Sequence, residues 1–213
     1  MTARKPLPAT HSPQEPSPFA VLLRAGASWL GVLVLGAGAG MALVSAAWGV
    51  GAVVVIAVAS GAGAVTFRFS GRTWLLVLTV AFAILYGVAV AMTCVGYVSV
   101  HGERYTATAL SSECHDARSG TACTARFARP DGTLLDEDVS VASKIVPGTA
   151  VDLVEDRAGI VETLAAADAD ADALPFDVLF VMACAVGLAV LFGLAGRLRV
   201  RYPDRPGRHR RRR

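Results

Sequence analysis

Residues 25–67 read AGASWLGVLVLGAGAGMALVSAAWGVGAVVVIAVASGAGAVTF, and these 43 residues between Arg24 and Arg68 contain no charged side chain. A single helix of that length would extend about 65 Å, because a helix rises about 1.5 Å per residue. The hydrocarbon core of a bilayer is only about 30 Å thick. The stretch therefore predicts two membrane-spanning helices joined by a tight turn, at about 25–46 and 48–66.

Two further apolar runs lie downstream. Residues 73–97 carry no charge, and 19 uncharged residues lie between Asp177 and Arg197. Each run is long enough to cross a bilayer, which takes about 20 helical residues. The chain is 54% hydrophobic and only 17% charged, whereas a soluble domain carries about 25% charged residues. The sequence thus predicts a membrane α-helical bundle with further spans at about 73–97 and 176–196, and it disfavours a soluble enzyme.

The charged residues segregate along the chain, although the net charge is only +3. Basic residues lie before the first span, between the second and third, and after the fourth, where 197–213 contains nine arginines. The segment 98–177 holds 15 acidic residues against six basic ones. Because cytoplasmic segments of membrane proteins are rich in Lys and Arg, we expect four spans in the cell membrane with both termini cytoplasmic. Three spans would place basic segments on both faces.

The two tails differ in composition. Residues 1–18 contain five prolines and predict a disordered cytoplasmic tail. Residues 197–213 follow the fourth span directly, so we expect this cytoplasmic tail to bind anionic lipid headgroups of the bilayer rather than nucleic acid. The arginines expected in this contact are Arg197, Arg199, Arg201, Arg208 and Arg210.

Residues 98–164 consist of short alternating segments separated by turn residues. The turns at 129–132 and 147–148 combine Pro with Gly, which preset φ and tolerate positive φ, respectively. Short strands between such turns predict a small all-β extracytoplasmic domain, barrel-like or sandwich-like, which an acidic linker at 165–175 follows. The expected strands are Tyr105–Ala109, Cys123–Phe127, Leu134–Val141, Val151–Leu153 and Ile160–Leu164.

Cys114 and Cys123 flank a turn-rich loop within this segment. A domain this small has a marginal core, and compartments outside the cytoplasm are oxidising. We therefore expect a Cys114–Cys123 disulfide, which stabilises a loop of this size by roughly 2–3 kcal/mol. A metal site that adds His115 and Asp116 is the alternative, although adjacent Cys and His do not match the usual zinc spacing.

Small residues four positions apart recur in the predicted spans. Gly36 and Gly40 share one helix face, as do Ala183 and Gly187, and such pairs let neighbouring helices approach closely. The glycines from 36 onward also resemble a dinucleotide-binding loop, but Met41 stands at the third glycine position and no acidic residue follows about 20 positions later. We expect helix packing at these four residues and no cofactor.

Four short motifs carry a resemblance: GERYTA at 102–107, RPDG at 129–132, PGTAVDL at 147–153 and DRAG at 156–159. On these motifs the segment 98–164 resembles a family of uncharacterised actinobacterial membrane proteins with a small extracytoplasmic β-domain. The family has no assigned activity, so the resemblance implies a fold and a membrane location but no catalytic residues.

The chain contains no zinc-protease, P-loop or nucleophile-elbow motif, and we expect neither catalysis nor a bound metal. The predicted function is that of an integral membrane protein that displays a disulfide-stapled β-domain to a protein or cell-envelope partner. The alternative is an accessory subunit of a membrane transport or channel complex.

Overall fold

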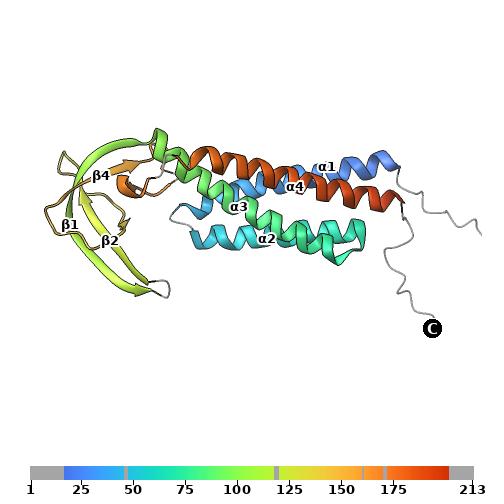
Figure 1. Cartoon of the computed structure of the whole chain (residues 1–213), viewed down its shortest axis with the longest axis horizontal. Coiled ribbons are helices and arrows are strands. Elements are labelled where there is room, and N and C mark those ends of the chain that lie inside the picture. Colours follow the sequence, from blue (N-terminus) through green and yellow to red (C-terminus); the bar gives the residue numbers. More distant parts are fainter. Residues whose placement is uncertain (1–16, 46–47, 118–119, 160, 170–171, 202–213) are drawn as a thin grey trace, which may run out of the picture.

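The computed structural model describes residues 17–45, 48–117, 120–159, 161–169 and 172–201, which form a helix bundle with a small sheet at one end (Figure 1). The helices are α1 (Pro18–Leu43), α2 (Trp48–Ser70), α3 (Thr73–His101) and α4 (Leu174–Arg201). Within the described residues, these four are long and apolar enough to cross a membrane, which confirms the predicted set of apolar helices. They alternate in direction, so α1 starts and α4 ends at the bundle end farther from the sheet (Figure 1).

Local capping sets the helix ends. Ser17 accepts a hydrogen bond from the Ala20 amide through its Oγ (3.2 Å), and Pro18 occupies the first helical turn. Proline fits there because amides of the first turn have no helical partner. The helix α1 therefore begins before the expected residue 25, and the remainder of the predicted tail, 1–16, lies outside the described residues. Gly71 ends α2 at φ +64°, a left-handed conformation that glycine adopts without strain.

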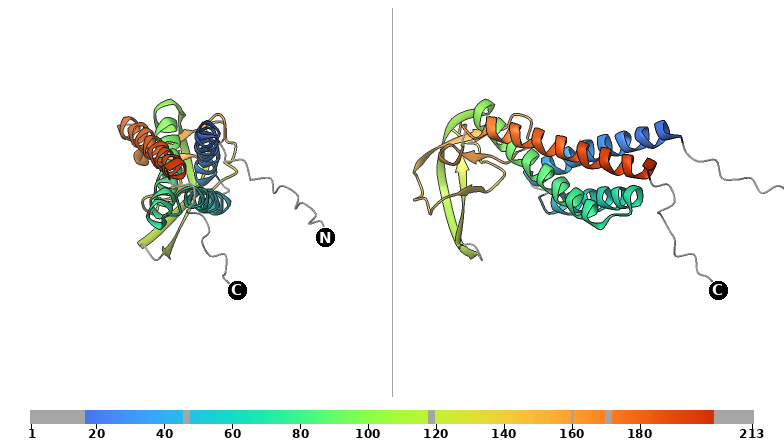
Figure 2. Two further views of the ribbon diagram at one scale, coloured as in Figure 1. Left: turned by 90° about the vertical axis from the view of Figure 1, so that its right-hand side faces the viewer. Right: turned by 45° about the vertical axis from the view of Figure 1, so that its right-hand side comes forward.

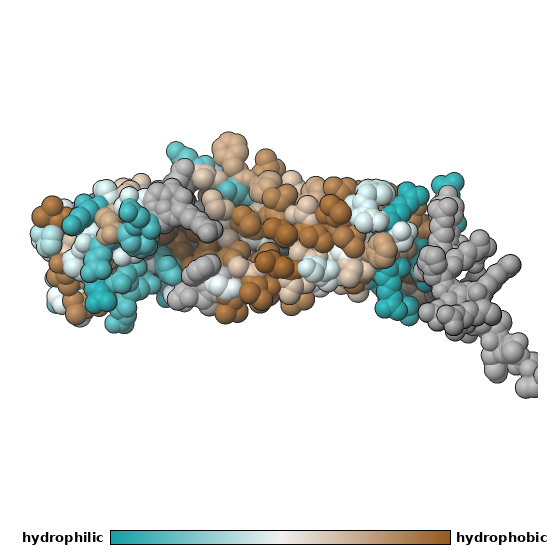
Figure 3. All heavy atoms as spheres, turned by 90° about the horizontal axis from the view of Figure 1, so that it is seen from below, coloured by the Kyte–Doolittle hydropathy of each residue, from teal (hydrophilic) through white to brown (hydrophobic). Residues whose placement is uncertain are grey.

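The bundle buries small side chains and exposes large ones. Ala59, Ala62 and Ala195 are at most 3% exposed, whereas Val34 and Leu179 are 71% and 67% exposed. Buried small residues allow close helix approach, and exposed aliphatic ones suit a hydrocarbon surrounding. Figure 3 shows the resulting hydrophobic middle, in brown, between two hydrophilic ends.

The segment between α3 and α4 forms an antiparallel sheet with strand order β3-β2-β1-β4-β5. Its edge strands β3 and β5 approach each other, so the sheet curls around a core that contains Phe127, Val139 and Leu153. The predicted small β-domain is thus confirmed in its barrel-like form. The strands are β1 (Glu103–Ala117), β2 (Gly120–Ala128), β3 (Val139–Val141), β4 (Ala150–Glu155) and β5 (Leu164–Ala165).

Two expected strands are shorter than predicted. The strand expected at Leu134–Val141 is only Val139–Val141, and Leu134 forms an isolated bridge to Ala128. Acidic residues at 136–138 intervene, and aspartate is depleted in strands. The strand expected at Ile160–Leu164 is only Leu164–Ala165, and residue 160 itself lies outside the described part of the chain.

The expected linker at 165–175 contains regular structure at both ends. Ala165 belongs to β5, the 3₁₀ helix η1 (Ala166–Asp168) follows, and α4 begins at Leu174. The helix α4 also continues beyond the expected residue 196 to Arg201. Arg197, Arg199 and Arg201 are therefore helical.

The first strand is longer than expected. It covers 15 residues, Glu103–Ala117, because its pairing with β2 continues to the Ala117–Gly120 pair. The resulting β1–β2 hairpin lies crosswise over the end of the bundle and reaches past the outline of the helices (Figures 1 and 2).

The bundle and the sheet are joined through a compact junction. Gly102 is the single residue between α3 and β1, and a Cβ there would lie 2.5 Å from Val154 Cγ1. Val98, Val154 and Val161 form a buried cluster across the junction. The amide of Glu162 also donates to the carbonyl of Val44, at the end of α1 (3.4 Å). The sheet is therefore packed directly against the helix ends.

Candidate functional site

The tip of the β1–β2 hairpin extends beyond the rest of the sheet. Pairing of β1 with β4 stops at Thr108–Ala150, and pairing of β2 with β3 stops at Cys123–Val141. Beyond Cys123 the hairpin is a two-stranded ribbon, which we define as 115–117 with 120–122. The side chains of His115, Asp116 and Thr121 within it are exposed.

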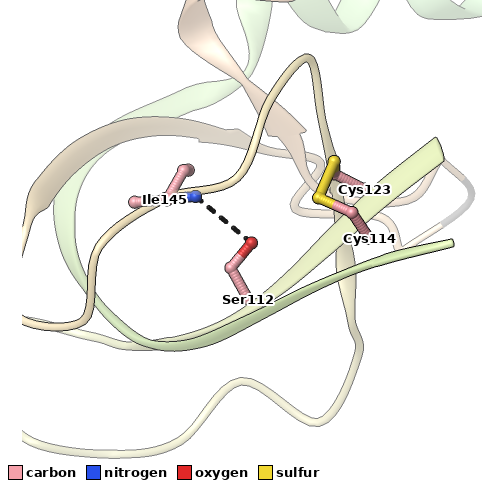
Figure 4. Close-up of a disulfide and its surroundings, with 4 residues drawn as sticks. All are labelled: Ser112, Cys114, Cys123 and Ile145. Atoms are coloured by element: carbon pink, nitrogen blue, oxygen red, sulfur yellow. Dashed lines mark hydrogen bonds between the residues drawn. A yellow bond between two sulfur atoms is a disulfide. The ribbon is translucent and has the colours of Figure 1, made fainter. Parts of the chain in front are cut away.

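A disulfide between Cys114 and Cys123 closes the base of this ribbon (Figure 4). Cys123 belongs to the buried core of the sheet, whereas Cys114 is exposed. Nearby, the amide of Ile145 donates to Ser112 Oγ (3.3 Å) and ties the β3–β4 connection to β1. Because the two sulfur atoms bond to each other, neither supplies the thiolate that the alternative metal site required.

A polar groove lies at one mouth of the barrel-like sheet. On β1, Ala107 is buried in the core and Tyr105 is partly buried against it. Glu103 shares this face because side chains alternate along a strand. Arg129 follows the buried Phe127, and Glu155 follows the buried Leu153, at the same two-residue spacing. The core face thus ends in charged residues.

These residues surround a groove, which we call the mouth groove. It encloses about 470 Å³ and is lined by Glu103, Tyr105, Arg129, Pro130, Asp131, Glu155 and Arg157.

Two ion pairs cross the mouth groove. Arg129 Nη2 lies 2.6 Å from Glu155 Oε1, and Arg157 Nε lies 2.9 Å from Glu103 Oε2. The first pair is about one third exposed, with side-chain exposures of 38% and 32%, whereas the Arg157 side chain is 84% exposed. The groove therefore has a sheltered inner pair and a solvent-exposed outer pair.

Tyr105 forms the floor between these charges. Its ring lies 6.0 Å from the guanidinium carbon of Arg129. Its hydroxyl is shielded from solvent, and no described group meets it at hydrogen-bonding geometry. Burial raises the pKa of this hydroxyl, an effect that Arg129 opposes and Glu155 reinforces. Interaction with the Tyr105 hydroxyl and the charge of Glu155 in turn raise the pKa of the Arg129 guanidinium.

The turn at the groove edge fixes Asp131. Its carboxylate Oδ1 accepts hydrogen bonds from Thr133 Oγ1 (2.7 Å) and from the Thr133 amide (2.9 Å). These two bonds hold the pKa of Asp131 below its ordinary value. Asp131 therefore stays ionised at neutral pH as a third carboxylate beside Glu103 and Glu155.

The sequence did not predict the mouth groove. Tyr105, Arg129 and Glu155 come from three different strands or strand ends, and the ion pairs span 26 and 54 residues. A detectable signal was the shared alternation of Glu103 and Tyr105 with the apolar Ala107. That signal needs the strand register before it places the residues together.

The predicted packing residues have mixed outcomes. A Cβ on Gly36 would lie 2.9 Å from the Tyr86 ring, and one on Gly40 would lie 2.7 Å from the carbonyl oxygen of Gly87, so both glycines pack against α3. Gly187 packs against Phe82, also on α3. Ala183 is exposed, so it does not pack against another helix of this bundle. It lies one turn before Gly187, next to the buried Cys184.

Three of the five arginines predicted to bind lipid lie at the bundle end away from the sheet. Arg197, Arg199 and Arg201 are there together with Arg68, whose carbonyl accepts a long contact from Arg199 Nη1 (3.5 Å). Arg208 and Arg210 lie outside the described residues. The structure thus adds Arg68, at the end of α2, to a surface that was predicted from the tail alone.

Comparison with protein-family models, with curated proteins and with solved structures finds no match to this chain. The resemblance to actinobacterial membrane proteins therefore stays a prediction, and function has to be argued from the chain itself.

Proposed function

We propose that this chain is a non-catalytic, multi-pass protein of the cell membrane that displays its β-domain outside the cytoplasm to a protein or cell-envelope partner. The four apolar helices supply the membrane anchor. The arginine-rich end of the bundle takes the cytoplasmic side under the positive-inside rule. The acidic sheet end then faces outward, where a disulfide persists.

The stapled ribbon is the observation that carries this proposal. A two-stranded hairpin is marginally stable by itself, yet the chain extends one beyond the last pairing of the sheet and closes its base with a disulfide. The ribbon adds no side chain to the described core of the domain. A segment that is cross-linked at its base, exposed and dispensable for the core is suited to contact a partner.

Orientation is tested by labelling intact cells with a membrane-impermeant thiol reagent. Ser140→Cys on the exposed face of β3 should react in intact cells, whereas Arg201→Cys should react after permeabilisation. The unmodified chain gives the background from Cys94 and Cys184. The opposite pattern would overturn the proposed topology.

Display to a partner is tested with a photo-reactive amino acid at Thr121 in the ribbon and, as the matched control, at Ser140. Both side chains are exposed, but only Thr121 lies on the ribbon. We expect a discrete adduct from Thr121, weakened when Cys114→Ser loosens the ribbon. Equal adducts from both positions, or none from either, would contradict a ribbon-centred interface.

A groove on the bundle favours the second candidate, an accessory subunit of a transport or channel complex. It encloses about 440 Å³ between α1 and α2, and small residues such as Gly31, Ala57 and Gly61 line it. No heavy atom would lie within 4 Å of a Cβ at Gly31 or Gly61. Such a surface admits the close approach of another transmembrane helix.

Purification in mild detergent separates the two candidates. An accessory subunit predicts a stoichiometric membrane partner that is lost in Gly61→Leu and retained in Gly26→Leu. Gly26 is the matched control because it is also an exposed glycine with no neighbour within 4 Å of its Cβ. Purification without such a partner favours the display function.

We further propose that the arginine end binds anionic lipid headgroups through Arg197, Arg199 and Arg201, together with Arg208 and Arg210 of the tail. Each basic residue near an anionic surface contributes about 1 kcal/mol. A 197–213 peptide should bind liposomes more strongly as their anionic lipid content rises. Binding that ignores lipid charge would overturn this part of the proposal.

A further inference from the structure

We propose that the mouth groove binds a small zwitterion, in which a primary ammonium group lies a few ångströms from a phosphate or carboxylate. A phosphoethanolamine lipid headgroup and a free amino acid both have this chemistry. The groove lies on the proposed displayed domain but is separate from the ribbon, so this site does not depend on what the ribbon binds.

The paired charges of the groove favour a ligand that carries one positive and one negative group. Its lining holds two guanidinium groups and three carboxylates, and each arginine is already paired with a glutamate. An anion that took Arg157 would leave Glu103 without its partner, and a cation that took Glu103 would leave Arg157 without its own. A zwitterion replaces both partners together, so neither Arg157 nor Glu103 is left uncompensated.

The exposure of the side chains determines which of the two ion pairs separates when the ligand binds. The Arg157–Glu103 pair is held by two largely exposed side chains, at 84% and 55%. Exposed pairs are weakly held, because water screens them and side-chain entropy opposes them. The Arg129–Glu155 pair is more sheltered and keeps the shape of the groove. The ligand therefore exchanges with the outer pair while the inner pair stays in place.

The floor of the groove offers an unused polar group. The Tyr105 hydroxyl is buried beside Arg129 and Glu155, and neither side chain meets it at full hydrogen-bonding geometry. Enclosed polar groups are normally satisfied. A phosphate or carboxylate oxygen that enters between Arg157 and Tyr105 would accept this hydroxyl proton in a hydrogen bond. The ammonium group would then lie toward Glu103 and Asp131 at the rim.

Size and location agree with a small ligand. About 470 Å³ falls in the range of small-molecule sites, which are frequent at barrel mouths. Glu103 is two residues from His101, the last residue of α3. With the bundle inserted as proposed, the groove lies close to the headgroups of the outer leaflet, so a lipid can supply the zwitterion.

The test is titration calorimetry on the purified full chain in an uncharged maltoside detergent. The probes are glycerophosphoethanolamine, glycine, ethanolamine alone and inorganic phosphate alone. We expect saturable binding of at least one zwitterion, with both single-charge probes at least about 10-fold weaker. Binding of glycerophosphoethanolamine but not glycine assigns the lipid headgroup chemistry, and the reverse assigns a free amino acid.

Matched variants locate the site. Arg157→Gln and Tyr105→Phe should weaken zwitterion binding by about 10-fold and 5-fold. Arg126→Gln removes a comparable exposed pair, Arg126 Nε to Asp138 Oδ1 at 2.8 Å, and should leave binding unchanged. Thermal unfolding of each variant checks that the fold is retained, which the high exposure of Arg157 and Arg126 favours.

Several outcomes would overturn the proposal. They are equal binding of ethanolamine, equal binding of phosphate, absence of binding by both zwitterions, and equal losses in Arg157→Gln and Arg126→Gln. None of these outcomes affects the Thr121 adduct or the labelling of Ser140→Cys. Failure of the groove and failure of the proposed display function are therefore distinguishable.

Discussion

The bundle exposes many of its large apolar side chains on its surface, whereas the β-domain buries such side chains in its interior. In the bundle, alanines and glycines fill the contacts between helices, and Val34 and Leu179 face outward. In the β-domain, Phe127 and Leu153 are fully buried, and charged pairs such as Arg126–Asp138 lie on the surface. One chain thus contains two packing arrangements, and under the proposed membrane insertion each of them matches a different solvent.

The difference shows what holds each region together. Helices in hydrocarbon gain little from hiding apolar surface, so close packing between small residues has to stabilise them. A small domain in water gains from every buried aliphatic group, but its core is limited. The disulfide adds a constraint on the unfolded chain that the core cannot supply.

The largest expected effect is in the β-domain core. Phe127→Ala should destabilise the domain by about 3–5 kcal/mol, because it removes a fully buried ring and leaves a cavity. Leu134→Ala, at a side chain that is 64% exposed on the same domain, serves as control and should change little. Thermal unfolding of the full chain in detergent measures both. Equal effects would break the contrast between core and surface.

In the bundle, enlargement should be the damaging change. Gly40→Leu should destabilise α1–α3 packing by about 3 kcal/mol, because a Cβ there would already lie 2.7 Å from a backbone oxygen. Gly38→Leu is the matched control on the same helix, where no heavy atom would lie within 4 Å. Detergent thermostability of the two variants is the measurement. If Gly38→Leu were equally harmful, packing against α3 would not explain the result.

Removal of the disulfide should have the next largest effect and should act locally. Cys114→Ser should cost about 2–3 kcal/mol by the loop-entropy argument, while Cys123 keeps its place in the core. Hydrogen exchange should quicken in 115–122 and stay slow around Phe127. A uniform increase across the sheet would show that the bond stabilises the whole barrel rather than the ribbon.

The smallest effect concerns Asp131. Its folded pKa is lowered, so its contribution to stability is full at neutral pH and is lost as the pH falls through the lowered value. Thr133→Val removes one of the hydrogen bonds and should raise the Asp131 pKa toward its ordinary value, which moves that loss to higher pH. Carboxyl titration by NMR measures the shift. If the Asp131 pKa did not change in Thr133→Val, the Thr133 hydroxyl would not be a cause of the lowered pKa.

Much of the fold is predictable from the sequence because the patterns that indicate it, in hydropathy and in charge, extend over many residues. The uncharged run 25–67 is twice as long as one span, and the charge pattern predicts how the spans alternate across a membrane. Helix ends are less predictable, since Ser17 and Pro18 extend α1 through capping rather than hydropathy. The length of β1 is also hidden, because Ser111–Asp116 lacks alternation and forms a strand through its pairing with β2.

The candidate sites also differ in how far they could be predicted from local sequence. Cys114 and Cys123 are close in sequence, so composition and compartment suffice to predict their bond. The exposure of Ala183 depends on how α4 is rotated in the bundle, which residue spacing alone leaves open. The mouth groove depends on strand register, because Glu103 meets Glu155 only through the β1–β4 ladder.

The uncharged interior of the bundle has an electrical consequence. No Asp, Glu, Lys, Arg or His lies within 25–67, 73–100 or 178–196. A potential of 100 mV does about 2.3 kcal/mol of work on each elementary charge that crosses a membrane, and these helices offer it no charge to move. Once inserted as proposed, the apolar middle of the bundle offers the membrane potential no charge to move, so a change in its conformation has to be driven by binding rather than by voltage.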